Sequence, residues 1–222
     1  MRTAVFFAAV GGAFIVWAVN SSHVLASSDG SSLTSVNGSV HADPGKTYDT
    51  LSTVNGQVHV ASGVTANEAK TVNGSVVIEN DVKLGEASTV NGSLRIGEGS
   101  TIEREASTVN GSLSLGKRAR VGGDVSTVSG AILLEGAEVG GSLTTRNGDI
   151  ELREGAHVRG SIHVKKKNES GWNWGKDDQP LEVHICATCV VDGELRFDRA
   201  VELRVDPGAK IGKVIGDAVT RR

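Results

Sequence analysis

A short phrase, Thr-Val-Asn-Gly, returns at nearly constant spacing along this 222-residue chain. The glycine of the phrase, or of a weakened copy of it, stands at positions 38, 56, 74, 92, 111, 130 and 148, so successive copies lie 18, 18, 18, 19, 19 and 18 residues apart. A fixed period of this length is typical of a solenoid, in which each repeat is one structural unit stacked on the next. The repeat therefore predicts a stacked architecture.

Apolar residues alternate over short runs within each unit. Val76 and Ile78 follow one Asn-Gly pair, and Leu94 and Ile96 follow the next. Such alternation is typical of half-buried strands, and no stretch with helical periodicity is long enough to fill a helical repeat. Aromatic residues make up only 4% of the chain, so the core must be built in thin layers from Val, Leu, Ile and Ala. We predict an all-β, single-stranded β-helix of about nine coils of ~18 residues, stacked ~4.8 Å apart over about 40 Å.

The Asn-Gly pair is expected to form one corner of every coil. Both residue types tolerate positive φ, which a sharp corner requires and β-branched residues resist. Stacking of the coils would place the asparagines above one another, so that their side-chain amides bond along the stack as a ladder. The predicted ladder consists of Asn37, Asn55, Asn73, Asn91, Asn110 and Asn147.

Two patterns bear on the handedness of the coil. Between Val36 and Ile102 an apolar or small residue recurs at every sixth position, as in left-handed hexapeptide solenoids. Residues 136–143 instead read Gly-Ala-Glu-Val-Gly-Gly-Ser-Leu, and residues 155–162 read Gly-Ala-His-Val-Arg-Gly-Ser-Ile. This second phrasing resembles bactofilins, the polymer-forming cytoskeletal proteins, and the Asn-Gly-Ser-Val phrasing resembles related adhesin-like β-solenoids of bacterial envelopes. The resemblance extends over residues 35–215 and implies a right-handed, triangular β-helix that assembles end to end, with a left-handed coil as the alternative.

The N-terminus has the pattern of a secretory signal peptide. A short positive region precedes an apolar run over residues 3–19, and Val24-Leu25-Ala26 fits a small-residue cleavage site. Residues 1–26 are therefore predicted to be a signal, and residues 27–34 a cap or linker before the first coil. The apolar run is nearly long enough to span a bilayer, so an uncleaved N-terminal anchor is the alternative. Either way we expect an exported protein of the periplasm or the cell surface.

Regular coils are predicted over residues 35–164, where an insertion over residues 165–180 interrupts them. Aligning Val183 on Ile150 also places Leu195 on Ile162, an offset of 33 residues. This offset equals one 18-residue coil and 15 inserted residues. The coils should therefore resume after the insertion, with residues 181–222 forming the last coils and a C-terminal cap.

The insertion combines lysines with two tryptophans and is the least repetitive stretch outside the signal. Insertions in solenoids map to loops, often on a binding face, and these residue types would suit an anionic glycan, a lipid headgroup or a protein partner. The alternative is a loop that packs against the edge of a coil. The candidate binding residues are Lys165, Lys166, Lys167, Trp172, Trp174 and Lys176.

The only two cysteines, Cys186 and Cys189, form a Cys-x-x-Cys at a turn between two predicted strands. A redox centre would need a thioredoxin-like βαβ context, which is missing. A zinc site would need two further ligands, of which only His184 is near in sequence. A local disulfide in an oxidising envelope is expected, with two small residues packed at the turn as the alternative.

Catalytic residues are not expected, because the serines recur with the repeat and no histidine has a unique acid beside it in sequence. His41 and His59 occupy the same position in successive coils, which predicts an outward stack. Since hexapeptide acyltransferases place a catalytic histidine on a left-handed coil, an acyltransferase-like or carbohydrate-active enzyme is the alternative function.

The formal net charge of −3 and the pI near 6.1 argue against a nucleic-acid partner. We predict a non-enzymatic β-solenoid that serves as a structural, self-assembling or adhesive element of the bacterial envelope, without a cofactor or metal. Its expected partners are further copies joined end to end, or an envelope glycan or protein. Membrane contact is expected only through an uncleaved N-terminal segment.

Overall fold

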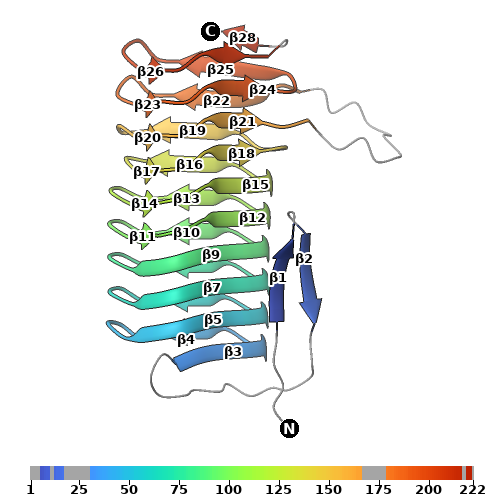
Figure 1. Cartoon of the computed structure of the whole chain (residues 1–222), viewed down its shortest axis with the longest axis vertical. Helices are drawn as coiled ribbons and strands as arrows, with labels where there is room; N and C mark the ends of the chain where they lie inside the picture. Colours follow the sequence, from blue (N-terminus) through green and yellow to red (C-terminus); the bar gives the residue numbers. More distant parts are fainter. Residues whose placement is uncertain (1–5, 11–12, 18–30, 167–178, 217–218, 222) are drawn as a thin grey trace, which may run out of the picture.

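The computed structural model of the chain describes residues 6–10, 13–17, 31–166, 179–216 and 219–221 (Figure 1). Every regular element within these ranges is a β-strand. From Ser31 onward the chain winds into a parallel β-solenoid of about nine coils, so the predicted fold class is confirmed. In the ranges described, no helix is long and apolar enough to cross a membrane.

The segment predicted to be a signal peptide contains a separate two-stranded antiparallel sheet. Strand β1 (Phe6–Val10) pairs with β2 (Ala13–Trp17). The predicted cleavage site at Ala26 and residues 27–30 of the predicted cap lie outside the described residues.

One face of the solenoid is a sheet of ten short parallel strands. In order along the solenoid these are β4 (Val40–Ala42), β6 (Val58–Val60), β8 (Val76–Ile78), β10 (Leu94–Ile96), β13 (Leu113–Leu115), β16 (Ile132–Glu135), β19 (Ile150–Arg153), β22 (Leu181–Ile185), β25 (Val201–Val205) and β28 (Val219–Arg221). Each strand except β4 and β28, which end the sheet, pairs with the strands of the coils before and after it, and this is the stacking that the repeat predicts.

The remaining strands form a sheet of sixteen that supplies two further rows. The second row is β3 (Ser31–Asn37), β5 (Thr47–Asn55), β7 (Thr65–Asn73), β9 (Lys83–Asn91), β12 (Ala106–Asn110), β15 (Val125–Ser129), β18 (Leu143–Thr145), β21 (Ile162–Val164), β24 (Leu195–Phe197) and β27 (Val214–Ile215). The third row is β11 (Thr101–Ile102), β14 (Arg120–Val121), β17 (Glu138–Val139), β20 (His157–Val158), β23 (Val190–Val191) and β26 (Lys210–Ile211).

Three rows give each coil three sides, as a triangular cross-section requires. The early strands β5, β7 and β9 run around a corner and contribute to both the second and the third row. Strand β11 pairs with Lys83–Leu84 and β12 with Ala87–Asn91 of the same strand β9, so the extra residue of the 19-residue spacing lies at this corner. The handedness of the coil stays a prediction.

The core is a set of apolar columns that run along the solenoid. In the ten-stranded sheet Leu94, Leu113, Ile132 and Ile150 lie in register, each at most 1% exposed. Burying a side chain of this size stabilises the fold by about 1.5–3 kcal/mol. Because alternate residues of a strand face opposite sides, the same register aligns the outward residues into columns as well.

The glycine of the repeat is needed because two corners approach closely. A Cβ added to Gly74 would lie 2.0 Å from the carbonyl oxygen of Gly56 in the coil before, which no side chain tolerates. Positive φ does not explain the asparagine: among the described non-glycine residues it occurs only at Asp81, Arg118 and Glu154. The expectation that asparagine is chosen for its backbone conformation is therefore wrong, and its role lies in its side chain.

The solenoid continues across the insertion with the predicted offset. Val183 pairs with Ile150 and Leu195 with Ile162, which confirms the alignment of the two coils. Strand β21 ends at Val164 and β22 begins at Leu181. Residues 167–178 of the insertion lie outside the described part of the chain.

Candidate functional site

The outer face of the ten-stranded sheet carries a groove of about 700 Å³ over β10, β13, β16, β19 and β22. Its central column is formed by the middle residues of these strands, which lie in register and face away from the core. In order these are Arg95, Ser114, Leu133, Glu151 and His184. Small residues on both sides of the column, among them Ser112 and Gly116, leave the face hollowed.

The groove has different charges at its two ends. Arg95 stands alone at the β10 end, whereas Glu135, Asp149, Glu151 and Glu182 line the end near β19 and β22. Some of these carboxylates are held within the fold: Asp149 accepts a hydrogen bond from the backbone N–H of Glu182 at 2.8 Å. The arrangement makes the β19–β22 end acidic.

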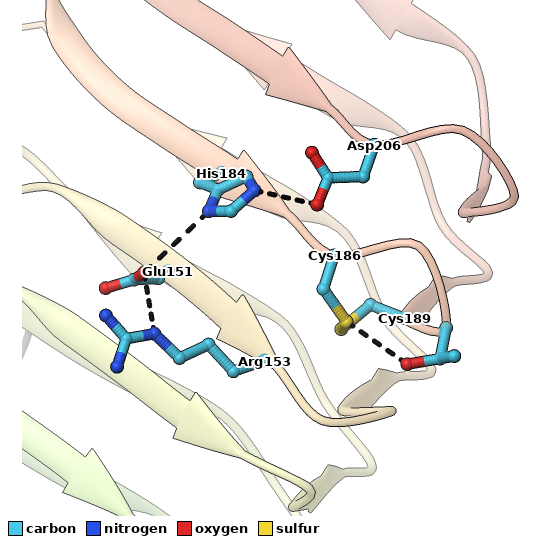
Figure 2. The surroundings of a disulfide bond; sticks show 7 residues. Glu151, Arg153, His184, Cys186, Cys189 and Asp206 are labelled. Carbon is cyan, nitrogen blue, oxygen red and sulfur yellow. Dashed lines mark hydrogen bonds and ion pairs between the residues drawn. A yellow bond between two sulfur atoms is a disulfide. The ribbon is translucent and has the colours of Figure 1, made fainter.

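Arg153 and His184 both contact Glu151 at the acidic end of the groove (Figure 2). The Arg153 Nε donates to Glu151 Oε1 at 2.7 Å, and this bond raises the pKa of the guanidinium above its usual value. The His184 Nδ1 lies 3.7 Å from the same Glu151 oxygen, and its Nε2 lies 3.2 Å from Asp206 Oδ2. This buried Nε2 is close to Asp206 but poorly aligned, so the described residues give it no hydrogen bond. His184 is therefore held between two carboxylates, one from each neighbouring coil.

Cys186 and Cys189 are joined by a disulfide at the corner that follows β22 (Figure 2). The Sγ atoms lie 2.18 Å apart and the Cα atoms 5.1 Å apart. Cys189 is fully buried in the core, and Cys186 is half-buried with its Sγ 3.4 Å from the Thr188 hydroxyl. The disulfide closes a four-residue turn. Within the described ranges no three His, Cys, Asp or Glu side chains converge as a metal site would require.

His41 and His59 lie in register on the outer face of β4 and β6, and their rings meet edge to face with their centroids 5.6 Å apart. The His59 Nε2 lies 3.0 Å from Glu79 Oε1. Hydrogen bonds from the Ser62 hydroxyl and N–H, at 2.9 and 3.0 Å, are the main reason that the pKa of Glu79 lies below its usual value. The pair is thus an edge-to-face contact between an exposed and a half-buried histidine, beside a hydrogen-bonded carboxylate.

The asparagines of the first five coils form a continuous chain of side-chain hydrogen bonds. The Nδ2 of Asn55, Asn73, Asn91 and Asn110 each donates to the Oδ1 of the asparagine before it, at 2.9–3.0 Å. The predicted sixth member is not continuous with them, because Ser129 occupies the intervening coil and pairs with Asn147 only through the backbone. Asn147 Oδ1 instead accepts from the Arg199 guanidinium at 3.5 Å.

Only two of the six residues predicted as a binding loop lie in the described chain. Lys165 is half-buried directly after β21, and Lys166 is exposed beside it. Lys167, Trp172, Trp174 and Lys176 lie outside the described residues.

Carboxylate partners of the histidines were missed from the sequence. Asp192, Asp198 and Asp206 each approach a histidine of the coil before, at 2.8, 2.7 and 3.2 Å. The sequence signal that could have revealed these pairs is an aspartate two residues after the residue that aligns with the histidine in the next coil.

Neither a family model, nor a curated protein, nor a solved structure matches the chain.

Proposed function

We propose that this protein is an exported, non-enzymatic structural element of the bacterial cell envelope that assembles by stacking its solenoids end to end. The observation that carries the proposal is the state of the two ends. Strands β4 and β28 terminate the ten-stranded sheet, so each has one edge without a partner strand in the described chain. Unpaired parallel edges are templates for further pairing.

The burial of side chains in the first and last coils also supports end-to-end stacking. Ile211 and Val214 are only half-buried, whereas Val191 at the equivalent place one coil earlier is 1% exposed. At the other end Leu33 is half-buried against the core. A second copy stacked in register would cover these side chains and pair the free edges at once.

Export is proposed from the sequence of residues 1–26, and the envelope role from the repeat phrasing that resembles bactofilins and adhesin-like solenoids. The outer surface is consistent with a passive role, because many of its ionisable groups are engaged in ion pairs, such as Arg120 with Glu138 of the next coil and Lys117 with Glu154 two coils further on.

Assembly is tested with one charged substitution at each end. Leu33→Lys and Ile211→Lys each place an ammonium group on one end, and each should block growth at that end only. Val128→Lys, at a half-buried residue on the side of the solenoid, is the matched control. We expect filaments by electron microscopy, and sedimentation that rises with concentration, for the unsubstituted protein and the control.

The contact between two ends is heterologous, so the two variants make a further test. Each variant alone should stay a monomer, because every contact would include one blocked end, and an equimolar mixture should form dimers through the two intact ends. A protein that sediments as a monomer at every concentration, with all coils folded by circular dichroism, contradicts the proposal.

A further inference from the structure

A second hollow lies at the C-terminal end of the molecule, where β21 ends and β24 runs into β25. It has a volume of about 530 Å³, within the ~300–1,000 Å³ typical of ligand sites. The residues that line it are Lys166, Arg196, Phe197, Asp198, Arg199, Ile215 and Gly216. Three of these side chains are cations and one is a carboxylate, in a protein whose net charge is −3.

The sequence brings these charges together through strand register. Phe197 pairs with Val164 and is 3% exposed, so it faces the core. Arg196 and Asp198, on either side of it, therefore face outward. The backbone N–H of Asp198 donates to the Val164 carbonyl at 2.9 Å, which places Asp198 beside the chain that continues into Lys166.

The carboxylate of the pocket is already fully engaged. Asp198 Oδ2 lies 2.7 Å from His163 Nε2, and its Oδ1 accepts from Arg196 Nε at 3.2 Å. The hydrogen bond with His163 is the main reason that the pKa of Asp198 lies below its usual value. Asp198 is therefore ionised at neutral pH, and it is the one carboxylate among the residues that line the pocket beside three cations.

Arg199 contacts only neutral acceptors among the described residues. Its Nη1 donates to the Arg146 carbonyl at 3.1 Å and to Asn147 Oδ1 at 3.5 Å, and its Nη2 donates to the Gln179 carbonyl at 3.4 Å. These bonds fix the guanidinium, and no carboxylate of the described residues pairs with it. Arg120, by contrast, has the Glu138 carboxylate beside it.

We propose that this pocket, formed by Lys166, Arg196 and Arg199, binds an oxyanion: the carboxylate or phosphate group of an acidic envelope glycan. Guanidinium groups suit both anions, because their planar donors match two oxygens at once. A recess admits a charged substituent of a polymer, whereas a bilayer surface contacts protruding basic side chains. The choice of a glycan as carrier rests on the proposed envelope function, but oxyanion binding itself does not.

The test measures binding of the full-length protein to poly(glycerol phosphate) and to polygalacturonate, with dextran as the neutral polymer. The double variant Lys166→Gln with Arg196→Gln removes two charges and leaves Arg199 in place. We expect the unsubstituted protein to bind at least one acidic polymer and not dextran. The double variant should bind about tenfold more weakly, and added salt should weaken binding of the unsubstituted protein.

The matched control is Lys117→Gln with Arg118→Gln, which removes two exposed cations that lie outside the pocket, beside Glu154 and Glu98. This control should bind as the unsubstituted protein does. A second variant, Arg199→Lys, keeps the charge but removes the planar donors, and it should also bind more weakly.

Three results would overturn the proposal: equal binding by the double variant, an equal loss in the control, or binding only to vesicles of phosphatidylglycerol and phosphatidylcholine. The last result would identify a membrane surface as the partner. The same measurement on Leu33→Lys separates this proposal from the proposed assembly, because that variant blocks the opposite end of the solenoid. Polymer binding by a strictly monomeric protein would support the pocket and contradict assembly.

Discussion

At the scale of single residues, the threonine of the repeat does more than favour a strand. Thr53, Thr71, Thr89 and Thr108 are all nearly fully buried, and each hydroxyl donates to the glycine carbonyl of the corner before it. A buried polar atom costs free energy unless it is bonded, so the inward threonine and the glycine corner form one unit. Thr145 breaks the pattern, because its buried Oγ1 has no partner in the described chain.

This difference predicts opposite effects for one substitution at two sites. Thr89→Val removes a hydrogen bond of 2.8 Å to the Gly74 carbonyl and should lower the free energy of unfolding by about 1 kcal/mol. Thr145→Val removes only an unbonded buried hydroxyl, so it should be neutral or raise the free energy of unfolding by up to about 1 kcal/mol. Urea denaturation followed by circular dichroism measures both.

Thr89→Ser is the control, because it keeps the hydroxyl and loses only a methyl group. If Thr89→Val were no worse than Thr145→Val, the hydroxyl bond would not be what stabilises the corner.

At the scale of the elements, the asparagine ladder ties neighbouring coils together on one corner. It ends at Asn110 because Ser129 is too short to reach the amide before it, although Ser129 follows Asn110 in register. The interruption divides the corner into a laddered half and a half that relies on other contacts.

Ser129→Asn should extend the ladder by one coil. An amide at this position would lie in register between Asn110 and Asn147, and each new exposed bond is worth about 0.5 kcal/mol. We expect a rise of about 0.5–1 kcal/mol in the free energy of unfolding. Ser126→Asn, on the same strand but outside the column, is the control and should change nothing measurable; a gain of equal size there would show that the ladder is not its source.

The repeat predicted the coils and their register, because a period of 18 or 19 residues and inward apolar columns leave one way to stack. It even predicted that Leu195 follows Ile162 across the insertion. The histidine–carboxylate pairs and the cationic pocket could not be found this way. The carboxylate of each pair lies two residues off the register of its histidine, and the residues of the pocket come from separate segments of the chain. These side chains meet only once the coils are stacked.

At the scale of the whole molecule, a solenoid is as stable as the interfaces between its coils. The interface that the insertion interrupts carries a histidine–carboxylate pair on each of its three faces. His157 with Asp192, His163 with Asp198 and His184 with Glu151 lie at 2.8, 2.7 and 3.7 Å. This interface has to hold although the chain between its two coils is longer than elsewhere.

Other charges surround these three histidines. Glu138 lies opposite His157 on the coil before, and Arg196 lies opposite His163 on the coil after. His184 has Arg204 opposite it and Asp206 beside it, with Arg153 on the far side of Glu151. The contact between each histidine and its carboxylate is charge-assisted only while the carboxylate is ionised.

Acid should loosen this interface before it loosens an interface without histidine. The pKa of Asp198 lies below its usual value because of the His163 hydrogen bond, so its contribution is fully present above the ordinary aspartate pKa of 3.8 and is lost as the pH falls through the lower value. Hydrogen exchange, expressed as protection factors, should show that the amides of Ile162 and Leu195 lose about two- to fivefold protection between pH 5 and pH 2. Those of Leu113 and Ile132, in an interface without histidine, should lose less. Asp198→Asn should abolish the difference; if the two interfaces open together in the unsubstituted protein, the pairs do not set the strength of the junction.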